Sequence, residues 1–195
     1  MIGVPIKRNH AEIGLIRNQI GSAQISEFGA VLFLLISCIV LPLLNLSIIP
    51  VRFAMGKSIV GTETRSLAKS ETFSEAIKRN RDVADRWKTL QAIGGITVKD
   101  SALCLTIDST KTKRSMISTA PRRIPPSFLP DGSESPCVYL LDLKVDVEIS
   151  PLITVAWQQG SIPGLTGPIP IQFHESSAWE NLGRDPITGE FYVNQ

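Results

Sequence analysis

Histidine, cysteine and carboxylate side chains are the groups with which this chain could perform catalysis or hold a metal. His174 and Glu175 are adjacent near the C-terminus, where a carboxylate or thiol from elsewhere could complete a catalytic or metal-binding set. The other histidine, His10, is separated from them by a long apolar segment. The sequence contains no two-histidine metal motif, no Cys-x-x-Cys, no Gly-x-Ser-x-Gly and no glycine-rich phosphate loop. We therefore expect no enzyme activity, no metal and no cofactor, and a structural role for His174.

The three cysteines fall in two different settings. Cys38 lies inside the apolar segment, where a thiol behaves as a small packing residue. Cys104 and Cys137 lie downstream, each in or beside a predicted strand, and an oxidising compartment would permit a disulfide between them. Two free, buried thiols are the alternative.

Length and charge suit one modest domain attached to a membrane segment. The chain has 195 residues and a formal net charge of +2, with basic residues scattered among acidic ones. Because no basic stripe is present, we expect no nucleic-acid partner. The mean hydropathy of +0.13 is high for a soluble protein and comes mostly from one stretch.

That stretch is residues 28–51, which carry no formal charge and are rich in leucine, isoleucine, valine and phenylalanine. At ~1.5 Å per residue, a helix of this length crosses a hydrocarbon core of ~30 Å with some tilt. A cleavable signal peptide has a shorter head and a shorter apolar core, so we predict a retained transmembrane helix, kinked near Pro42. The size of the downstream part favours a cytoplasmic N-terminus, with the rest of the chain exported.

A carboxylate, Glu27, stands immediately before this stretch, and Gly21 lies just upstream of it. Together with Phe28, these residues resemble the class III signal of type IV pilins and pseudopilins. In that family a membrane peptidase cuts on the cytoplasmic side after a glycine, and a glutamate five residues into the mature chain begins the apolar helix. Here cleavage after Gly21 makes Glu27 the sixth mature residue, and a fifth-position glutamate requires cleavage after Ser22.

The resemblance implies that Glu27 and Phe28 act in assembly. In a packed filament, a buried carboxylate can be neutralised by the new amine of a neighbouring subunit, and the pair then sets the register between subunits. The alternative places Glu27 in the headgroup region as the polar end of a helix, where the N-terminal dipole favours a negative charge.

Downstream of the apolar stretch, the pattern predicts one amphipathic helix over residues 72–93. Thr72 and Glu75 have the spacing of a capping box, apolar residues recur at three- and four-residue steps, and Gly94-Gly95 supplies a stop. The residues between Arg52 and this helix either continue the membrane helix or bend away from it.

After this helix the apolar period falls to two, which is typical of strands. Residues 103–107, 141–149 and 169–173 alternate apolar and polar side chains, and residues 153–157 form a possible short strand. The one polar face of these strands indicates an antiparallel sheet. Between the first two strands, the Pro- and Ser-rich loop of residues 118–136 could be mobile or could bind a partner.

The expected fold is α+β and pilin-like: a long N-terminal transmembrane helix, a second amphipathic helix and a small antiparallel β-sheet. We divide the chain into a cytoplasmic leader and processing region (1–26), the transmembrane helix (27–55) and an exported α+β domain (56–195). Trp157 and Trp179 are expected in the core of that domain rather than as exposed anchors for a partner or a sugar.

Residues 162–181, IPGLTGPIPIQFHESSAWEN, resemble the closing strand of TadE-like proteins of the tight-adherence (Flp, type IVb) pilus assembly system. The resemblance implies a single-pass minor pseudopilin of the inner (cytoplasmic) membrane, whose C-terminal domain is periplasmic or extracellular. Its expected partners are the membrane, a prepilin peptidase, other pilins or pseudopilins and the pilus assembly platform. The alternative is a membrane-tethered exported binding or scaffold module that is never processed.

Overall fold

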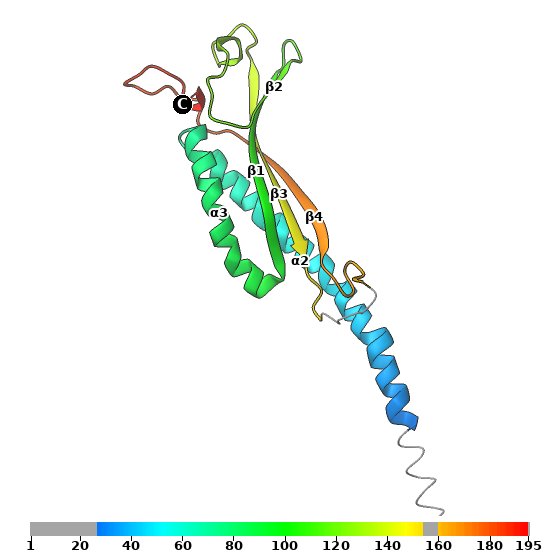
Figure 1. Cartoon of the computed structure of the whole chain (residues 1–195). Coiled ribbons are helices and arrows are strands. Elements are labelled where there is room, and N and C mark those ends of the chain that lie inside the picture. Colours follow the sequence, from blue (N-terminus) through cyan, green and yellow to red (C-terminus); the bar gives the residue numbers. More distant parts are fainter. Residues whose placement is uncertain (1–26, 154–159, 195) are drawn as a thin grey trace, which may run out of the picture. The chain divides into compact units, whose positions relative to one another are not determined.

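The computed structural model describes residues 27–153 and 160–194 (Figure 1). Within residues 83–93 it describes the helical backbone and, among the side chains, that of Trp87. The chain separates into two compact units, Met1–Leu44 and Asn45–Gln195. The described part of the first unit is helical, and the second unit contains the other helices and a four-stranded antiparallel sheet. The chain thus has the predicted long apolar helix and the small antiparallel sheet of an α+β fold.

One continuous helix runs over Glu27–Ala68. It consists of α-helix over residues 27–35, a π-helical turn, η1, at Ile36–Val40, and the α-helix α2, Leu41–Ala68. The residues after Arg52 therefore continue the helix rather than bending away from it.

The π-helical turn ends two residues before Pro42, which cannot donate a backbone hydrogen bond. Leu41 donates its N–H to the carbonyl of Ile36, five residues earlier, in the pattern that defines a π-helix. The proline is thus accommodated by a local widening within a continuous helix.

The amphipathic helix α3 spans Phe73–Gly94, which differs by one residue at each end from the predicted bounds. Thr72 is its N-cap and accepts a hydrogen bond from the N–H of Glu75 at 3.2 Å, as the capping box predicts. The Glu75 carboxylate accepts in return from the N–H of Glu71 at 3.0 Å. Gly95 ends the helix with a φ of 61°, a left-handed conformation that glycine adopts without strain.

The sheet has the strand order β2-β1-β3-β4, and each neighbouring pair is antiparallel. The strands are β1 (Ile96–Ser109), β2 (Ser115–Ser118), β3 (Cys137–Ile149) and β4 (Ile169–Ala178). β1, β3 and β4 contain the three predicted alternating stretches. The sequence pattern does not predict β2, because its four residues, SMIS, are too few to show an alternating period. The possible strand at 153–157 falls mostly outside the described residues.

The outer edge of β1 is only partly paired. β2 pairs with residues 105–108 of β1, and no described strand adjoins that edge along residues 96–104. A β-bulge between Val98 and Asp100 leaves Lys99 out of the register with β3. Bulges and charged side chains are features that discourage further pairing at an exposed edge.

The core of the second unit lies between one face of the sheet and the helices α2 and α3 (Figure 1). β3 contributes most to it, through the alternating buried side chains of Tyr139, Leu141, Leu143, Val145, Val147 and Ile149. Trp179 is buried and donates its Nε1–H to the carbonyl of Asn181 at 2.8 Å, so its predicted place in the core is confirmed. Trp157 lies outside the described residues.

The Pro- and Ser-rich loop of residues 118–136 is held at several points. The Tyr139 hydroxyl donates to the carbonyl of Phe128 at 2.7 Å, and the N–H of Ile124 donates to Oδ1 of Asn194 at 2.6 Å. The short 3₁₀ turns of this region are η2 (Pro126–Phe128) and η3 (Tyr192–Asn194). The loop is therefore folded against the core and the C-terminal residues.

Candidate functional site: the apolar helix and its junction with the domain

The N-terminal helix exposes an apolar surface along its first part. Glu27–Ala68 is the one helix in the described part of the chain that is long and apolar enough to cross a membrane. Glu27 is exposed, and the Phe28 side chain beside it is 68 % exposed. The other large apolar side chains exposed in this unit are Val31, Leu32, Phe33, Leu34, Leu35, Ile36, Ile39, Val40, Leu43 and Leu44. This surface makes the helix a candidate for single-pass membrane anchoring.

The predicted processing site lies outside the described residues. Gly21 and Ser22 both fall in residues 1–26, so cleavage after either of them stays a prediction. Glu27 and Phe28, the predicted assembly pair, are helical and are the first two described residues of the chain, so their role in assembly stays a prediction.

Asn45, the first residue of the second unit, ties α2 to the segment between β3 and β4. Its buried side chain, 2 % exposed, makes three hydrogen bonds at 2.9 Å. Nδ2 donates to the carbonyls of Ile153 and Leu165, and Oδ1 accepts from the N–H of Ile153. Both partners belong to the segment between β3 and β4. One amide therefore binds two parts of that segment to α2, which explains a polar residue inside the apolar stretch.

Arg52 is the first charged residue after the apolar stretch, and it joins three elements. Its guanidinium donates to the carbonyl of Ser150, just past the end of β3. It also lies against Gly95, where a Cβ would be 2.6 Å from the guanidinium carbon. Ser150 in turn donates its N–H to the Gly95 carbonyl at 2.8 Å. The end of α3, the end of β3 and α2 thus meet around this arginine.

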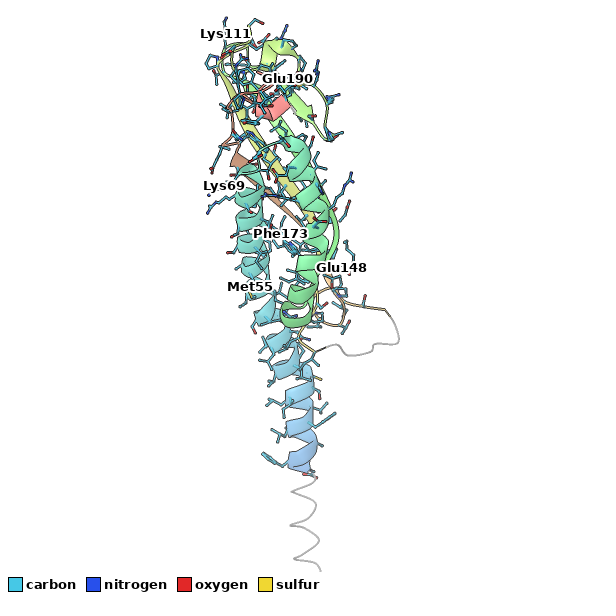
Figure 2. All side chains as sticks on the ribbon, turned by 90° about the vertical axis from the view of Figure 1, so that its left-hand side faces the viewer. Met55, Lys69, Lys111, Glu148, Phe173 and Glu190 are labelled. Carbon is cyan, nitrogen blue, oxygen red and sulfur yellow. The ribbon has the colours of Figure 1, made fainter. Side chains whose placement is uncertain are left out.

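Further along α2, the helix packs closely on β4. At Gly56 a Cβ would lie 2.7 Å from the ring of Phe173, which lies between the helices and the sheet (Figure 2). The ring centroids of Phe173 and Phe53 are 5.2 Å apart, with the ring planes tilted by 48°. Lys57 and Glu175 form an ion pair at 3.8 Å. A small residue, an aromatic pair and an ion pair together fix α2 against this strand.

The opposite face of the sheet carries His174, which sequence reasoning considered for chemistry, beside the carboxylate of Asp142. Asp142 is buried and accepts hydrogen bonds from the hydroxyls of Thr106, at 2.5 Å, and of Ser176. The Nε2 atom of His174 lies 3.6 Å from the same carboxylate. These side chains come from three adjacent strands, β1, β3 and β4.

This polar cluster has the geometry of a cross-link between strands. The described contacts join Ser176 and His174 to the aspartate, whereas an activated serine needs the histidine as its base. Among the described residues, no group of three or more His, Cys, Asp or Glu side chains is placed to hold a metal. Glu175, next to the histidine, pairs with Lys57 of α2 and takes no part in the cluster.

Cys104 and Cys137 are both free and lie on opposite faces of the sheet. Cys104 pairs in register with Asp142 on the polar face, whereas Cys137 lies at the start of β3 and packs against the core. The possible disulfide between them is therefore not formed. Burial raises the pKa of the Cys104 thiol, the Asp142 carboxylate raises it further, and Lys144 opposes the rise.

Sequence reasoning missed the contacts of Asn45 and Arg52. The compact domain begins at Asn45, inside the range 27–55 that we assign to the transmembrane helix. The available signal was the amide itself, because a polar group inside an uncharged apolar stretch needs a partner. The partner segment, however, lies more than a hundred residues away in the chain.

Comparison with protein-family models, with curated proteins and with solved structures finds no match to this chain. The function is therefore inferred from the residues of the chain itself.

Proposed function

We propose that this chain is a membrane-anchored, TadE-like minor pseudopilin that takes part in the assembly of a tight-adherence or type IV-like pilus. The observation that carries the proposal is an exposed apolar helix that is described from Glu27-Phe28 onward and continues into α2, which packs on an antiparallel sheet. This order of elements agrees in outline with the pilin plan. The TadE-like resemblance of residues 162–181 supports the same assignment.

In this role the apolar side chains of the helix pack against the helices of neighbouring pilin-like subunits. A carboxylate at membrane depth is costly unless it is neutralised. Glu27 therefore pairs with the amine that leader cleavage creates on a neighbouring subunit, and the pair sets the register. The exported domain performs no chemistry in this scheme and stands at the tip or the base of the fibre.

A membrane-tethered binding or scaffold module that is never processed is the second candidate. The observation that favours it is the spacing, because cleavage after Gly21 makes Glu27 the sixth rather than the fifth mature residue. In that role the helix is only a tether, and Glu27 lies in the headgroup region at the positive end of the helix dipole.

The intact mass of the membrane-extracted chain separates the two roles. The chain is expressed with and without a prepilin peptidase and weighed in each case. Loss of the first 21 or 22 residues only when the peptidase is present supports the pseudopilin and identifies the cleavage position. A full-length mass in both samples supports the unprocessed module.

A substitution at the helix start tests the assembly role directly. Glu27→Gln removes the charge with little change in shape, and co-purification with pilin-like partners should fall strongly while the domain stays folded. Glu180→Gln, which changes an exposed carboxylate of the domain, is the matched control. Equal co-purification of wild type and Glu27→Gln would count against the pseudopilin.

A further inference from the structure

One end of the second unit combines α2 with the segment between β3 and β4, and we call this end the base. It consists of residues 45–55 of α2 and the described residues of that segment, 150–153 and 160–168. Leu152 and Ile162 of the segment are each 52 % exposed. The exposed large apolar side chains of α2 in the base are Leu46, Val51, Phe53 and Met55. Water therefore meets apolar surface on both the helix and the segment.

The two parts of the base are fastened together. Asn45 binds the backbone at Ile153 and Leu165, as described above. Gly164, with a φ of 80°, lies so close to Ile49 that a Cβ would be 2.9 Å from the isoleucine Cδ1. The exposed apolar side chains of the segment are thus held beside the C-terminal half of the uncharged stretch.

The turn that carries Ile162 satisfies its own backbone. The Ile162 carbonyl accepts from the N–H groups of Leu165, Thr166 and Gly167 at 2.9–3.1 Å. The N–H of Ile162 donates to Oγ1 of Thr166 at 2.8 Å, and the N–H of Gly164 donates to the Gly167 carbonyl at 2.8 Å. A turn of this kind can leave water without leaving these groups unpaired, which is the condition for entering a lipid layer.

The length of the helix is consistent with a base that reaches the bilayer. From Glu27 to Asn45 the rise is about 27 Å at ~1.5 Å per residue, slightly less than a hydrocarbon core of ~30 Å. From Glu27 to Arg52, the next charged residue, it is about 37 Å by the same measure. The uncharged stretch ends at Val51, which lies in the base. If Glu27 marks one surface of the bilayer, the base must therefore lie close to the other surface, so that lipid covers the whole stretch.

The directions of the exposed side chains favour lipid over a protein partner. At about 100° per residue, Leu46 and Phe53 lie on one side of α2, and Val51 and Met55 lie on nearly the opposite side. A protein partner covers one face, whereas lipid surrounds a helix on every side not packed against its own domain. Arg52, whose guanidinium is held at the Ser150 carbonyl, places a cation at the height expected for headgroups.

We propose that the base is a lipid-binding surface, in which Leu152 and Ile162 enter the interfacial layer of the bilayer beside α2. The domain then contacts the membrane through three chain segments rather than through the helix alone. The inference rests on the membrane-spanning part of the proposed function and does not require pilus assembly.

The test places a fluorescent probe at single cysteines in the full chain, reconstituted in phosphatidylethanolamine–phosphatidylglycerol vesicles. The probe positions are Leu152→Cys and Ile162→Cys, in a background where the native cysteines are replaced by alanine. Native Cys38, kept alone, is the reference for the apolar helix. Ile187→Cys is the aqueous control, because this residue is 93 % exposed and lies near Glu190, at the opposite end of the domain from Glu148 (Figure 2).

For residues 152, 162 and 187, quenching by lipids brominated near the headgroup is compared with quenching by aqueous iodide; for Cys38, near the middle of the proposed span, the lipids are brominated deep in the acyl chains. We expect lipid quenching at residues 152 and 162 to be several-fold stronger than at residue 187, and iodide quenching to be correspondingly weaker. Quenching like that of residue 187 overturns the proposal, and so does protection from both quenchers, which would indicate a protein partner. If Cys38 is quenched by lipid and residues 152 and 162 are not, only the base proposal fails. If Cys38 is not quenched by lipid, the membrane span itself fails.

Discussion

Gly56 of α2 and Phe173 of β4 are in contact so close that no side chain fits between them. The Cβ of an alanine at position 56 would lie 2.7 Å from the Phe173 ring, which is itself buried. Gly56→Ala should therefore destabilise the domain by about 1–3 kcal/mol, despite the better helix propensity of alanine. Urea unfolding of the full chain in detergent micelles, followed by tryptophan fluorescence, measures the change.

Gly61→Ala is the matched control for this prediction, because a Cβ at Gly61 in the same helix meets nothing within 4 Å. It should stabilise the chain by up to about 1 kcal/mol through helix propensity alone. Equal effects of the two substitutions would show that helix propensity, and not contact with Phe173, governs position 56.

Asn45→Leu should loosen the segment between β3 and β4 while leaving the helix apolar and intact. The substitution removes three hydrogen bonds and leaves the N–H of Ile153 without its acceptor, at an expected cost of about 2–3 kcal/mol. Limited proteolysis should then cut within residues 150–168 faster than in the wild type. Leu46→Ala, at an exposed neighbouring position, should leave the cleavage rate nearly unchanged. Resistance of Asn45→Leu to cleavage would contradict a fastening role.

Asp142→Ala should destabilise the sheet by about 2 kcal/mol, because the hydroxyls of Thr106 and Ser176 lose their shared acceptor. Asp146→Ala, on the same strand, removes an exposed carboxylate with one hydrogen bond from Gln172 and should cost less than about 0.5 kcal/mol. Unfolding free energies in urea compare the two variants. Similar values for both would rule out a special role for the cluster.

The Tyr139 phenol should make the domain lose stability in alkali. Burial raises the pKa of Tyr139 far above its ordinary value, and Cys137 and Asp131 add to the rise. The folded state holds this proton more tightly than the unfolded state, so the stabilisation is complete below a pH of about 10 and is lost as the pH rises further.

Tyr139→Phe checks this sign, because the variant has no phenol proton to lose. At neutral pH it should be less stable by about 1 kcal/mol, since the Phe128 carbonyl loses its donor. Above a pH of about 10 its stability should fall less steeply than that of the wild type. If the stability of the two proteins falls equally steeply above this pH, the loss of stability in alkali comes from other groups, such as the Cys104 thiol, whose pKa is also raised.

The parts of the fold that follow from local interactions were predictable from the sequence. Thr72 and Glu75 mark the start of α3, Gly95 marks its end, and the alternation of residues 141–149 marks the longest run of β3. Each of these signals depends on neighbours within four residues, which a single sequence displays directly.

The parts that depend on distant partners were not predictable. Asn45 was visible as a polar residue in an apolar stretch, but its partners are separated from it by 108 and 120 residues. The same limit applies to the cysteines, because only the register of β1 with β3 shows that Cys104 and Cys137 lie on opposite faces. Long-range pairing is decided by packing, and packing leaves no period in the sequence.

The partly paired edge of β1 has a consequence for copies of this chain held in one membrane. The proposed anchoring would confine them to a plane, where they would collide often and in similar orientations, and a flat open strand edge would then join their sheets into an aggregate. The bulge at Lys99 and the carboxylate of Asp100 interrupt the stretch of edge that β2 leaves uncovered. If the chain is anchored as proposed, crowding in the membrane would therefore not fuse the sheets of neighbouring copies through this edge.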